Sequence, residues 1–255
     1  MLNPIIICPY IDENSIINLR NRLGHKLPVH FWQDQGRIGS DLAYQYLWNL
    51  HKDKDIIILH SDMLPMPGDT SNLWYTMLLE QVKMSAQTDG MFGMKLLYPA
   101  QSANNKWFIQ HAGGRFTTDG DSCHFGVTTP RENSTTSGKY EPEEDNGQYD
   151  QLREVSWVTF GGLYIRRSVI SAVGDFDPRF FWTYFRDVDY CLSAREAGFR
   201  ICQTSIPFLH AESQDNKILQ QQNPTLARKW GINRQIFFEK WSKDKLITID
   251  KDIAL

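Results

Sequence analysis

The 255-residue sequence lacks the features that mark secreted and membrane-spanning proteins. Its four cysteines form no CxxC pair, and we interpret them as reduced thiols of a cytosolic protein. No apolar run approaches the roughly 20 residues that a bilayer-spanning helix needs. The residues from Met1 on lack the basic start and long apolar core of a signal peptide. These absences predict a cytoplasmic protein without a transmembrane segment, and they leave peripheral contact with a membrane open.

The chain also lacks an excess of positive charge, since its formal net charge is -3. Proteins that bind nucleic acid through their surface charge carry clustered Lys and Arg, so we expect no nucleic-acid partner. What the sequence does contain is apolar material. Hydrophobic residues make up 41% of it and aromatic residues 13%, which is ample for one sizeable core, or for one domain with an appendage.

Strand patterns alternate with helix patterns over the first sixty residues. Short apolar runs at Ile5–Cys8, Val29–Trp32 and Ile56–Leu59 predict buried strands. The segment Ser40–Leu50 predicts one of the helices between them. This order predicts an α/β fold with a single mixed, mainly parallel sheet flanked by helices.

Later segments add further expected elements. A helix is predicted over Thr70–Ser85, with its apolar stripe at Leu73, Met77, Leu78 and Val82, and a strand over Val155–Phe160. Residues 216–241 predict two amphipathic helices separated near Gly231. The long polar segment Asp119–Gln151 predicts an active-site flap, with a disordered insertion as the alternative.

The third strand ends abruptly in His60, Ser61 and Asp62. An open α/β sheet places its ligand site at the C-terminal ends of such strands. His60 and Asp62 are two positions apart, so they would face the same side of an ideal strand. Nitrogen and oxygen ligands of this kind suit Mn²⁺ or Mg²⁺, which can bridge a diphosphate. The alternative is a polar turn stopped by Pro65.

Two further acids, Asp187 and Asp189, fall in the first turn of a helix predicted from Arg186 to about Ala197. The partial positive charge at a helix N-terminus favours carboxylates there. Both acids are therefore also explained as ordinary residues of a helix start.

A set of segments shares one order and spacing: Lys95–Pro99, Ile109–Gly114, Gly161–Arg167, Val173–Asp177, Phe185–Cys191 and Arg195–Ile201, followed by His210. Together they resemble a family 2 glycosyltransferase of GT-A fold. The segments Lys95–Pro99 and Ile109–Gly114 are similar to the middle of rhamnosyltransferase-like members. The resemblance covers most of residues 5–213.

The resemblance implies an inverting, metal-assisted glycosyltransferase. The donor would be a UDP- or dTDP-sugar, and the acceptor a hydroxyl of a glycan, lipid-linked or protein-linked molecule. Asp62 would be the metal-binding acid, His60 stands where the family carries the first acid of its motif, and His210 would be a further ligand of Mn²⁺ or Mg²⁺. Asp187 stands at the position of the general base, and Arg186 replaces the acid that the family usually has directly before it.

The resemblance also implies two sets of binding residues. The aromatic members of the second set, Trp157, Trp182 and Tyr184, would stack on sugar faces, although aromatic residues in such runs are more often part of a core. Donor binding is expected at Pro9, Tyr10, Asp34, Arg37, Gly39, His60, Ser61 and Asp62, and acceptor binding at Trp157, Gly161, Gly162, Trp182, Tyr184, Arg186 and Asp189.

The same resemblance predicts the domain organisation and leaves two rival functions. Residues 1–215 would form the GT-A domain, with a nucleotide-binding half at 1–100 and an acceptor half at 101–215, and 216–255 a helical extension packed on it. One rival is a non-catalytic module of the same fold that binds a sugar nucleotide or a glycan. The other is a metal-dependent phosphoesterase. Both rivals stay open because a fold alone does not establish a function.

Overall fold

The computed structural model describes residues 2–36, 38–128, 141–180, 184–211 and 226–253, without the side chains of 226–230. A nine-stranded sheet lies at its centre, with the strand order β11-β13-β5-β12-β3-β1-β2, and with β4 paired to β13 and β6 to β5. The strands of this sheet are β1 (Ile5–Tyr10), β2 (Val29–Gln33), β3 (Ile56–Ile58), β4 (Met63–Pro65), β5 (Asp89–Gln101), β6 (Trp107–His111), β11 (Arg153–Glu154), β12 (Leu163–Ile165) and β13 (Arg200–His210).

The predicted mixed α/β sheet is confirmed, and its parallel part is smaller than expected. β1 pairs in parallel with β2 and β3, and β5 with β13. β12 lies between β3 and β5 and is antiparallel to both, and β4, β6 and β11 also pair antiparallel. The strand–helix–strand repeats at the start of the chain therefore follow the parallel pattern that crossover helices produce.

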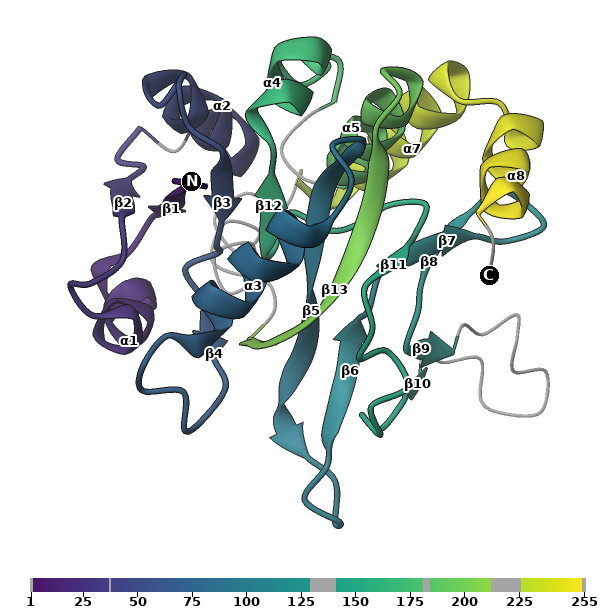
Figure 1. Ribbon diagram of the computed structural model, residues 1–255. Helices are drawn as coiled ribbons and strands as arrows, with labels where there is room; N and C mark the ends of the chain where they lie inside the picture. Colours follow the sequence, from purple (N-terminus) through teal and green to yellow (C-terminus); the bar gives the residue numbers. More distant parts are fainter. Residues whose placement is uncertain (1, 37, 129–140, 181–183, 212–225, 254–255) are drawn as a thin grey trace.

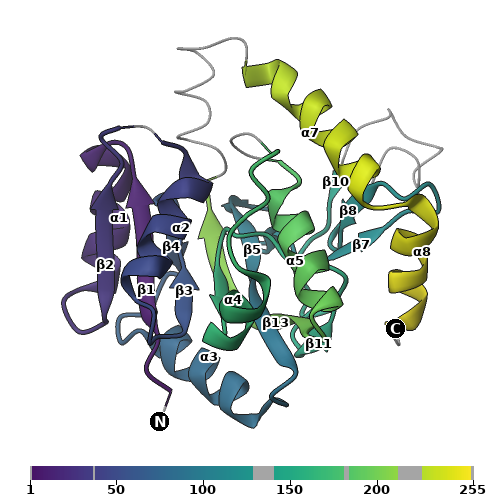
Figure 2. The same ribbon diagram turned by 90° about the horizontal axis from the view of Figure 1, so that it is seen from above.

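Helices cover both faces of the sheet (Figures 1 and 2). On one face, α1 (Glu13–Leu23) and α3 (Leu73–Met84) bury apolar side chains against Ile6 and Ile57. On the other face, α2 (Ser40–Leu50), α4 (Arg167–Val173) and α5 (Arg186–Glu196) pack against Ile7, Ile56 and Ile58. The alternation of side chains along β1 and β3 thus supplies two cores, one on each face. No helix in the described ranges is long and apolar enough to cross a membrane.

Two expected elements differ from the structure. In α3, Leu73 and Met77 of the predicted apolar stripe are 55% and 40% exposed, whereas Trp74 is buried. The buried face of the helix therefore lies to one side of the predicted stripe. Val155–Phe160 is not a strand: β11 ends at Glu154, and the segment after it makes only an isolated bridge between Trp157 and Gly114.

The polar segment Asp119–Gln151 holds structure of its own where it is described. It contains β8 (Ser122–His124), which pairs with β7 (Gly114–Phe116), and β9 (Val127–Thr128), which pairs with β10 (Glu141–Pro142). Its last part is fixed to the sheet by Lys95, a buried residue of β5 that pairs with Asp145 at 2.7 Å and also with Asp150. Residues 129–140 lie outside the described ranges, so the flap stays a prediction.

The C-terminal helices pack beside α5 (Figure 2). α7 (Leu226–Lys240) continues through Gly231, so the expected break there is wrong. The helix ends instead at Lys240, and α8 (Lys243–Asp252) begins after Trp241 and Ser242. The Ser242 hydroxyl caps α8 by accepting a hydrogen bond from Lys245 N at 3.4 Å. A single glycine inside a helix costs about 1 kcal/mol, which is too little to interrupt a helix held by packing.

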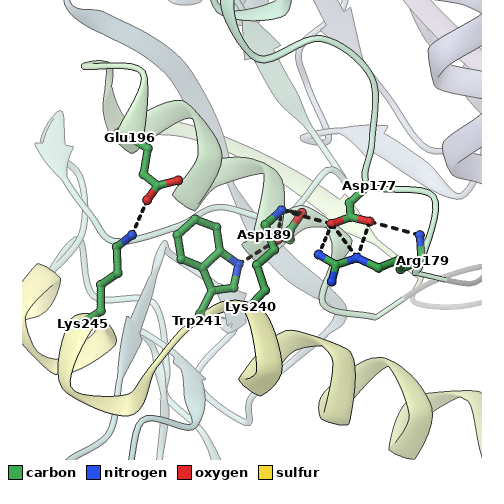
Figure 3. A network of polar contacts seen from close by, with 7 residues as sticks. All are labelled: Asp177, Arg179, Asp189, Glu196, Lys240, Trp241 and Lys245. Carbon is green, nitrogen blue, oxygen red and sulfur yellow. Dashed lines mark hydrogen bonds and ion pairs between the residues drawn. The ribbon is translucent and has the colours of Figure 1, made fainter.

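A polar network joins α5 to these helices (Figure 3). Asp189 of α5 is 3% exposed, and it accepts a hydrogen bond from Trp241 Nε1 at 2.7 Å. Lys240 Nζ lies 2.8 Å from the Asp189 carboxylate and 3.3 Å from that of Asp177. Burial raises the pKa of Asp189, while Lys240 and Trp241 oppose that increase. The carboxylate thus depends on the C-terminal helices for its compensating partners.

We predict that Trp241→Phe lowers the free energy of unfolding by at least about 2 kcal/mol, because it removes the indole donor from a buried carboxylate and shrinks a buried ring. Urea unfolding monitored by circular dichroism measures this loss. The control is Lys245→Ala, which removes an exposed ion pair with Glu196 and should cost no more than about 1 kcal/mol. Equal losses in the two variants would show that the Asp189 contact does not hold the helices together.

Candidate functional site

The turn after β3 brings together three predicted metal ligands. Met63 N donates to His60 O at 3.2 Å and closes the turn. β4 then pairs antiparallel with β13, with Met63 opposite His210, and Ala211 N donates to Asp62 O at 3.1 Å. As a result, ligand atoms of His60, Asp62 and His210 all lie within 4.8 Å of one another. The expected proximity of His60 and Asp62 is present, although a turn produces it and not the alternation of a strand.

His210 is held so that one ring nitrogen faces Asp62. Its Nδ1 lies 2.5 Å from Gln110 Oε1, and with the amide in this orientation the Nδ1–H must be the donor. His210 Nε2 is buried and has no hydrogen-bond partner among the described residues, and it lies 3.2 Å from Asp62 Oδ1. A ring nitrogen and a carboxylate oxygen at this distance both offer lone pairs, so the arrangement calls for a proton or a cation between them.

His60 completes the cluster from the other side. Its ring is stacked on Tyr44 of α2 with a centroid distance of 6.0 Å, and it lies 5.4 Å from the ring of His210. The pKa of His60 is lowered to about 4, chiefly by burial and also by the nearby His210, while Asp62 opposes the decrease. The imidazole is therefore neutral at pH 7, which is the form that binds metals.

These residues fit a divalent cation. The set comprises two imidazoles and one carboxylate, and the buried His210 Nε2, which faces Asp62 Oδ1 at 3.2 Å, has a lone pair to offer a cation. Mg²⁺ prefers an all-oxygen environment, whereas Mn²⁺ and other transition metals accept imidazole nitrogen together with carboxylate oxygen. Of the two expected ions, Mn²⁺ suits the donor atoms better.

Gly161 and Gly162 lie directly against this cluster. A Cβ on Gly161 would be 3.2 Å from His60 Nδ1, and one on Gly162 would be 2.7 Å from Met63 Cε. Gly162 also has a φ of +97°, in the region that favours glycine. The two glycines therefore allow the loop before β12 to approach the His60 turn closely.

The same loop leads to Asp187. This acid lies in the first turn of α5, and its Oδ1 accepts a hydrogen bond from Val188 N at 2.9 Å. Burial raises the pKa of Asp187 to about 6, while hydrogen bonds from the backbone and from the side chain of Thr159 oppose the increase. Just before this loop, Val158 N donates to Cys191 Sγ of α5 at 3.5 Å, so residues 158–162 run between α5 and the His60 turn.

The start of α5 is built on an unusual backbone. Tyr184 and Phe185 have φ values of 71° and 66°, so two successive residues other than glycine adopt the left-handed conformation. Each such residue costs of order 1–3 kcal/mol, and such strain concentrates at functional sites. Tyr184 is 42% exposed, and its carbonyl accepts a hydrogen bond from Asn233 Nδ2 at 3.1 Å. Its side chain is accessible to an acceptor.

Arg186 has partners that the sequence did not reveal. Its guanidinium forms an ion pair with Asp41 of α2 and donates to Phe180 O. Burial and the nearby Asp187 raise the pKa of Asp41, and Arg186 opposes this increase. Asp41 comes one helical turn before Tyr44 on α2, and that spacing is the signal that could have pointed to it.

Trp157 and Asp189, both predicted to bind the acceptor, have other partners in the structure. Trp157 is 3% exposed and packs against His111 and His124, with ring centroid distances of 5.1 and 5.0 Å. Its indole lies so close to Gly114 that a Cβ there would be 2.0 Å from it. Trp157 is therefore part of the core and not a sugar platform, and Asp189 faces α7 and α8 as described above.

The predicted nucleotide residues lie at the ends of β1 and β2. The Asp34 carboxylate accepts hydrogen bonds from Ile38 N at 3.0 Å and Gly39 N at 3.2 Å, so it braces the loop that enters α2. Pro9 and Tyr10 end β1, and the Tyr10 hydroxyl donates to Glu13 at 2.6 Å. Ser61 is buried in the His60 turn. Arg37 and Trp182 lie outside the described residues.

No protein-family model matches the sequence, and none of the curated proteins compared with it matches. Among solved structures, the chain is similar to GalNAc-T7 with UDP, GalNAc and Mn²⁺, with a TM-score of 0.54 and 11% identity over 82% of this chain and 44% of that one. The catalytic domain of Drosophila beta1,4-galactosyltransferase 7 in complex with xylobiose gives a TM-score of 0.45 and 13% identity, over 85% and 73% of the two chains. The chain thus spans less than half of GalNAc-T7. The likeness to GalNAc-T7 concerns architecture alone: the chain has the GT-A glycosyltransferase fold.

Proposed function

We propose that this protein is an inverting glycosyltransferase that moves a sugar from a nucleotide-diphospho-sugar to an acceptor hydroxyl. The observation that carries the proposal is the placement of a metal-competent cluster, His60, Asp62 and His210, one short loop away from the carboxylate Asp187. An acidic proton acceptor near a diphosphate site is what a single displacement at a sugar carbon requires. Membership of family 2 rests on the sequence resemblance.

The cluster would bind the donor diphosphate. His60, Asp62 and His210 would hold Mn²⁺, which when bound neutralises the diphosphate and improves it as a leaving group. His60 supplies a neutral imidazole at pH 7, and Gln110 orients His210 from behind. Gly161 leaves room beside His60, where a larger residue would crowd the imidazole. The ends of β1 and β2 would take the nucleoside, for which UDP and dTDP are both proposed.

Asp187 would activate the acceptor. Its carboxylate takes the proton of the acceptor hydroxyl while the hydroxyl oxygen forms a bond to the anomeric carbon. The bond from that carbon to the diphosphate oxygen breaks, and its electron pair leaves with the nucleoside diphosphate. A single displacement of this kind inverts the anomeric configuration. The acceptor class is a glycan or glycoconjugate, with Tyr184 accessible beside the base.

A non-catalytic module that binds a sugar nucleotide is the alternative, and Arg186 is the feature that favours it. The pairing of Arg186 with Asp41 weakens the case for a non-catalytic module, because Asp41 compensates the positive charge next to Asp187. Turnover of a nucleotide sugar in the presence of acceptor separates a transferase from such a module. Hydrolysis of simple phosphate esters would indicate the phosphoesterase instead.

We predict that Asp62→Ala lowers the affinity for UDP or dTDP in the presence of Mn²⁺ by at least about 10-fold, because a charged ligand of the cation is lost. Isothermal titration calorimetry with and without Mn²⁺ measures the effect. The control is Asp53→Ala, an exposed acid just before β3 that should leave the affinity unchanged. The metal assignment is wrong if Asp62→Ala retains the full Mn²⁺-dependent affinity.

We predict that Asp187→Asn lowers kcat for transfer by about 10² to 10⁴-fold, because asparagine keeps the size of the side chain but cannot accept the proton. Binding of the donor should change little. The control is Asp189→Asn, for which we expect mainly a loss of stability, because its carboxylate holds Lys240 and Trp241. A larger kinetic loss in Asp189→Asn than in Asp187→Asn would move the base to Asp189.

We predict an acidic limb in the pH dependence of kcat/KM near pH 6, where the raised pKa of Asp187 lies. The active form is the carboxylate, so activity is full well above this pH and falls about tenfold per pH unit below it. Transfer assays between pH 4.5 and 8 at saturating Mn²⁺ measure the limb. An acidic limb near pH 4, the range of an unperturbed aspartate, would contradict the role of Asp187.

A further inference from the structure

A β-bulge interrupts β6 close to the candidate metal ligand His210. β6 pairs antiparallel with β5, and the register shifts between Leu96 and Leu97 of β5, so that Gln110 of β6 is an extra residue at this point. Bulges of this kind redirect side chains and are frequent next to active sites. β5 pairs on its other side with β13, which ends at His210 (Figure 1). The bulge therefore lies one strand away from the metal ligand.

The Gln110 side chain reaches across β5 and contacts His210. Its Oε1 lies 2.5 Å from His210 Nδ1, and both residues are 8% exposed. With the carbonyl end of the amide at this position, Nδ1 carries the ring proton and donates it. A neutral imidazole has one N–H, so Nε2 keeps its lone pair, and it lies 3.2 Å from Asp62 Oδ1. The contact thus decides which nitrogen of His210 is able to bind a cation.

The other end of the Gln110 amide is left without a partner. Its Nε2 is buried and makes no hydrogen bond to any residue that the structure describes. A buried donor that stays unpaired destabilises the folded protein, and an apolar side chain of similar size would avoid that loss. Departures of this kind from the rules of stability concentrate at functional sites. The contact of Gln110 with His210 gives the amide a purpose that packing alone does not.

The residue after Gln110 supports the loop beside His60. His111 Nε2 accepts a hydrogen bond from Thr159 N at 3.3 Å, and His111 is 1% exposed. Gly161, two residues after Thr159, is the glycine that lies against His60. Two successive residues at the bulge of β6 therefore reach the surroundings of the candidate metal site, one through His210 and the other through this loop.

We propose that Gln110 is a positioning residue for the metal: it fixes the orientation and the tautomer of His210, so that Nε2 is offered to a divalent cation at the His60 turn. The inference rests on the proposed function in one respect, because it takes this cluster as the site of Mn²⁺. A metal-binding histidine usually donates the proton of its other ring nitrogen to an oxygen, and such partners are worth about 10- to 100-fold in metal affinity. The side-chain carbonyl of Gln110 is that oxygen.

The test compares Gln110→Met, which removes the amide at similar size, with Gln110→Glu, whose carboxylate still accepts from Nδ1–H. Mn²⁺ is titrated into each protein, alone and together with UDP or dTDP, and the free ion is followed by electron paramagnetic resonance. We expect Gln110→Met to lower the Mn²⁺ affinity by at least about 10-fold, and Gln110→Glu to retain it. Gln110→Leu removes the same oxygen if the methionine variant folds poorly, which circular dichroism shows.

The matched control is Gln203→Met, because Gln203 of β13 is also a fully buried glutamine. Its Nε2 donates to Thr204 O at 3.0 Å, and not to a metal ligand. This variant should leave the Mn²⁺ affinity unchanged, whatever it costs in stability. Full affinity in Gln110→Met, or an equal loss in Gln203→Met, would overturn the inference. So would an equal loss in Gln110→Glu, because it would mean that Gln110 donates to His210 instead of accepting from it.

Transfer assays supply a second measurement. In Gln110→Met, the Mn²⁺ concentration for half-maximal activity should rise by the same factor as the dissociation constant, while kcat at saturating Mn²⁺ changes little. A structural defect away from the metal would lower kcat at every Mn²⁺ concentration, and that result would also contradict the role of Gln110.

The metal titration needs neither sugar donor nor acceptor, so the two proposals fail separately. If the wild-type protein transfers sugar but Gln110→Met keeps its Mn²⁺ affinity, the role of Gln110 is wrong and the glycosyltransferase stands. If Gln110→Met loses affinity but the wild-type protein transfers no sugar, the glycosyltransferase is wrong and Gln110 still positions a metal ligand. A wild-type protein that binds no Mn²⁺, with or without nucleotide, overturns the role of Gln110 together with the metal assignment.

Discussion

The antiparallel pairing of β4 with β13 is the contact on which the proposed site depends. It sets Met63 opposite His210, and so brings a turn near residue 60 against the end of a strand near residue 210. Without this register, His60 and Asp62 would end a strand with no third ligand beside them. The pairing is short, and it is supported by β5, which pairs in parallel with β13 along much of its length. The central strands of the sheet therefore determine where the three candidate metal ligands lie.

The second constraint is the narrow space in which residues 159–162 run. The loop touches His60 through Gly161 and Met63 through Gly162, and Val158, just before it, contacts Cys191 of α5. Any side chain larger than hydrogen at either glycine would push these groups apart. The donor side and the acceptor side of the proposed reaction thus share one piece of backbone, and their separation is fixed by local packing instead of by two independently placed loops.

Local patterns were enough to predict the elements that carry strong periodicity. Ser40–Leu50 is a helix with the bounds expected from the sequence, and all three strands predicted in the first sixty residues are present, although β2, at the edge of the sheet, is only half-buried. The sequence also led to His60, Asp62 and His210 as one cluster, which the geometry brings together. Those predictions rest on short-range rules, namely side-chain periodicity and the chemistry at strand ends.

The predictions that failed or were absent depend on contacts between distant segments. Trp157 looks like an exposed stacking residue until Gly114, far away in sequence, is placed against its indole. Asp41 reads as an ordinary acid of a first helical turn, and its pairing with Arg186 exists only because α2 and α5 pack on the same face.

The link between Asp189 and the C-terminal helices has a consequence for how the site holds its shape over time. Asp189 is two residues from Asp187, and its charge is compensated by Lys240 and Trp241. If α7 and α8 opened transiently, a buried carboxylate would lose its partners and the strained start of α5 would lose its support. Regions joined in this way open together and not one by one. The last helices of the chain and the proposed base therefore belong to one cooperative unit, although they never need to touch the same ligand.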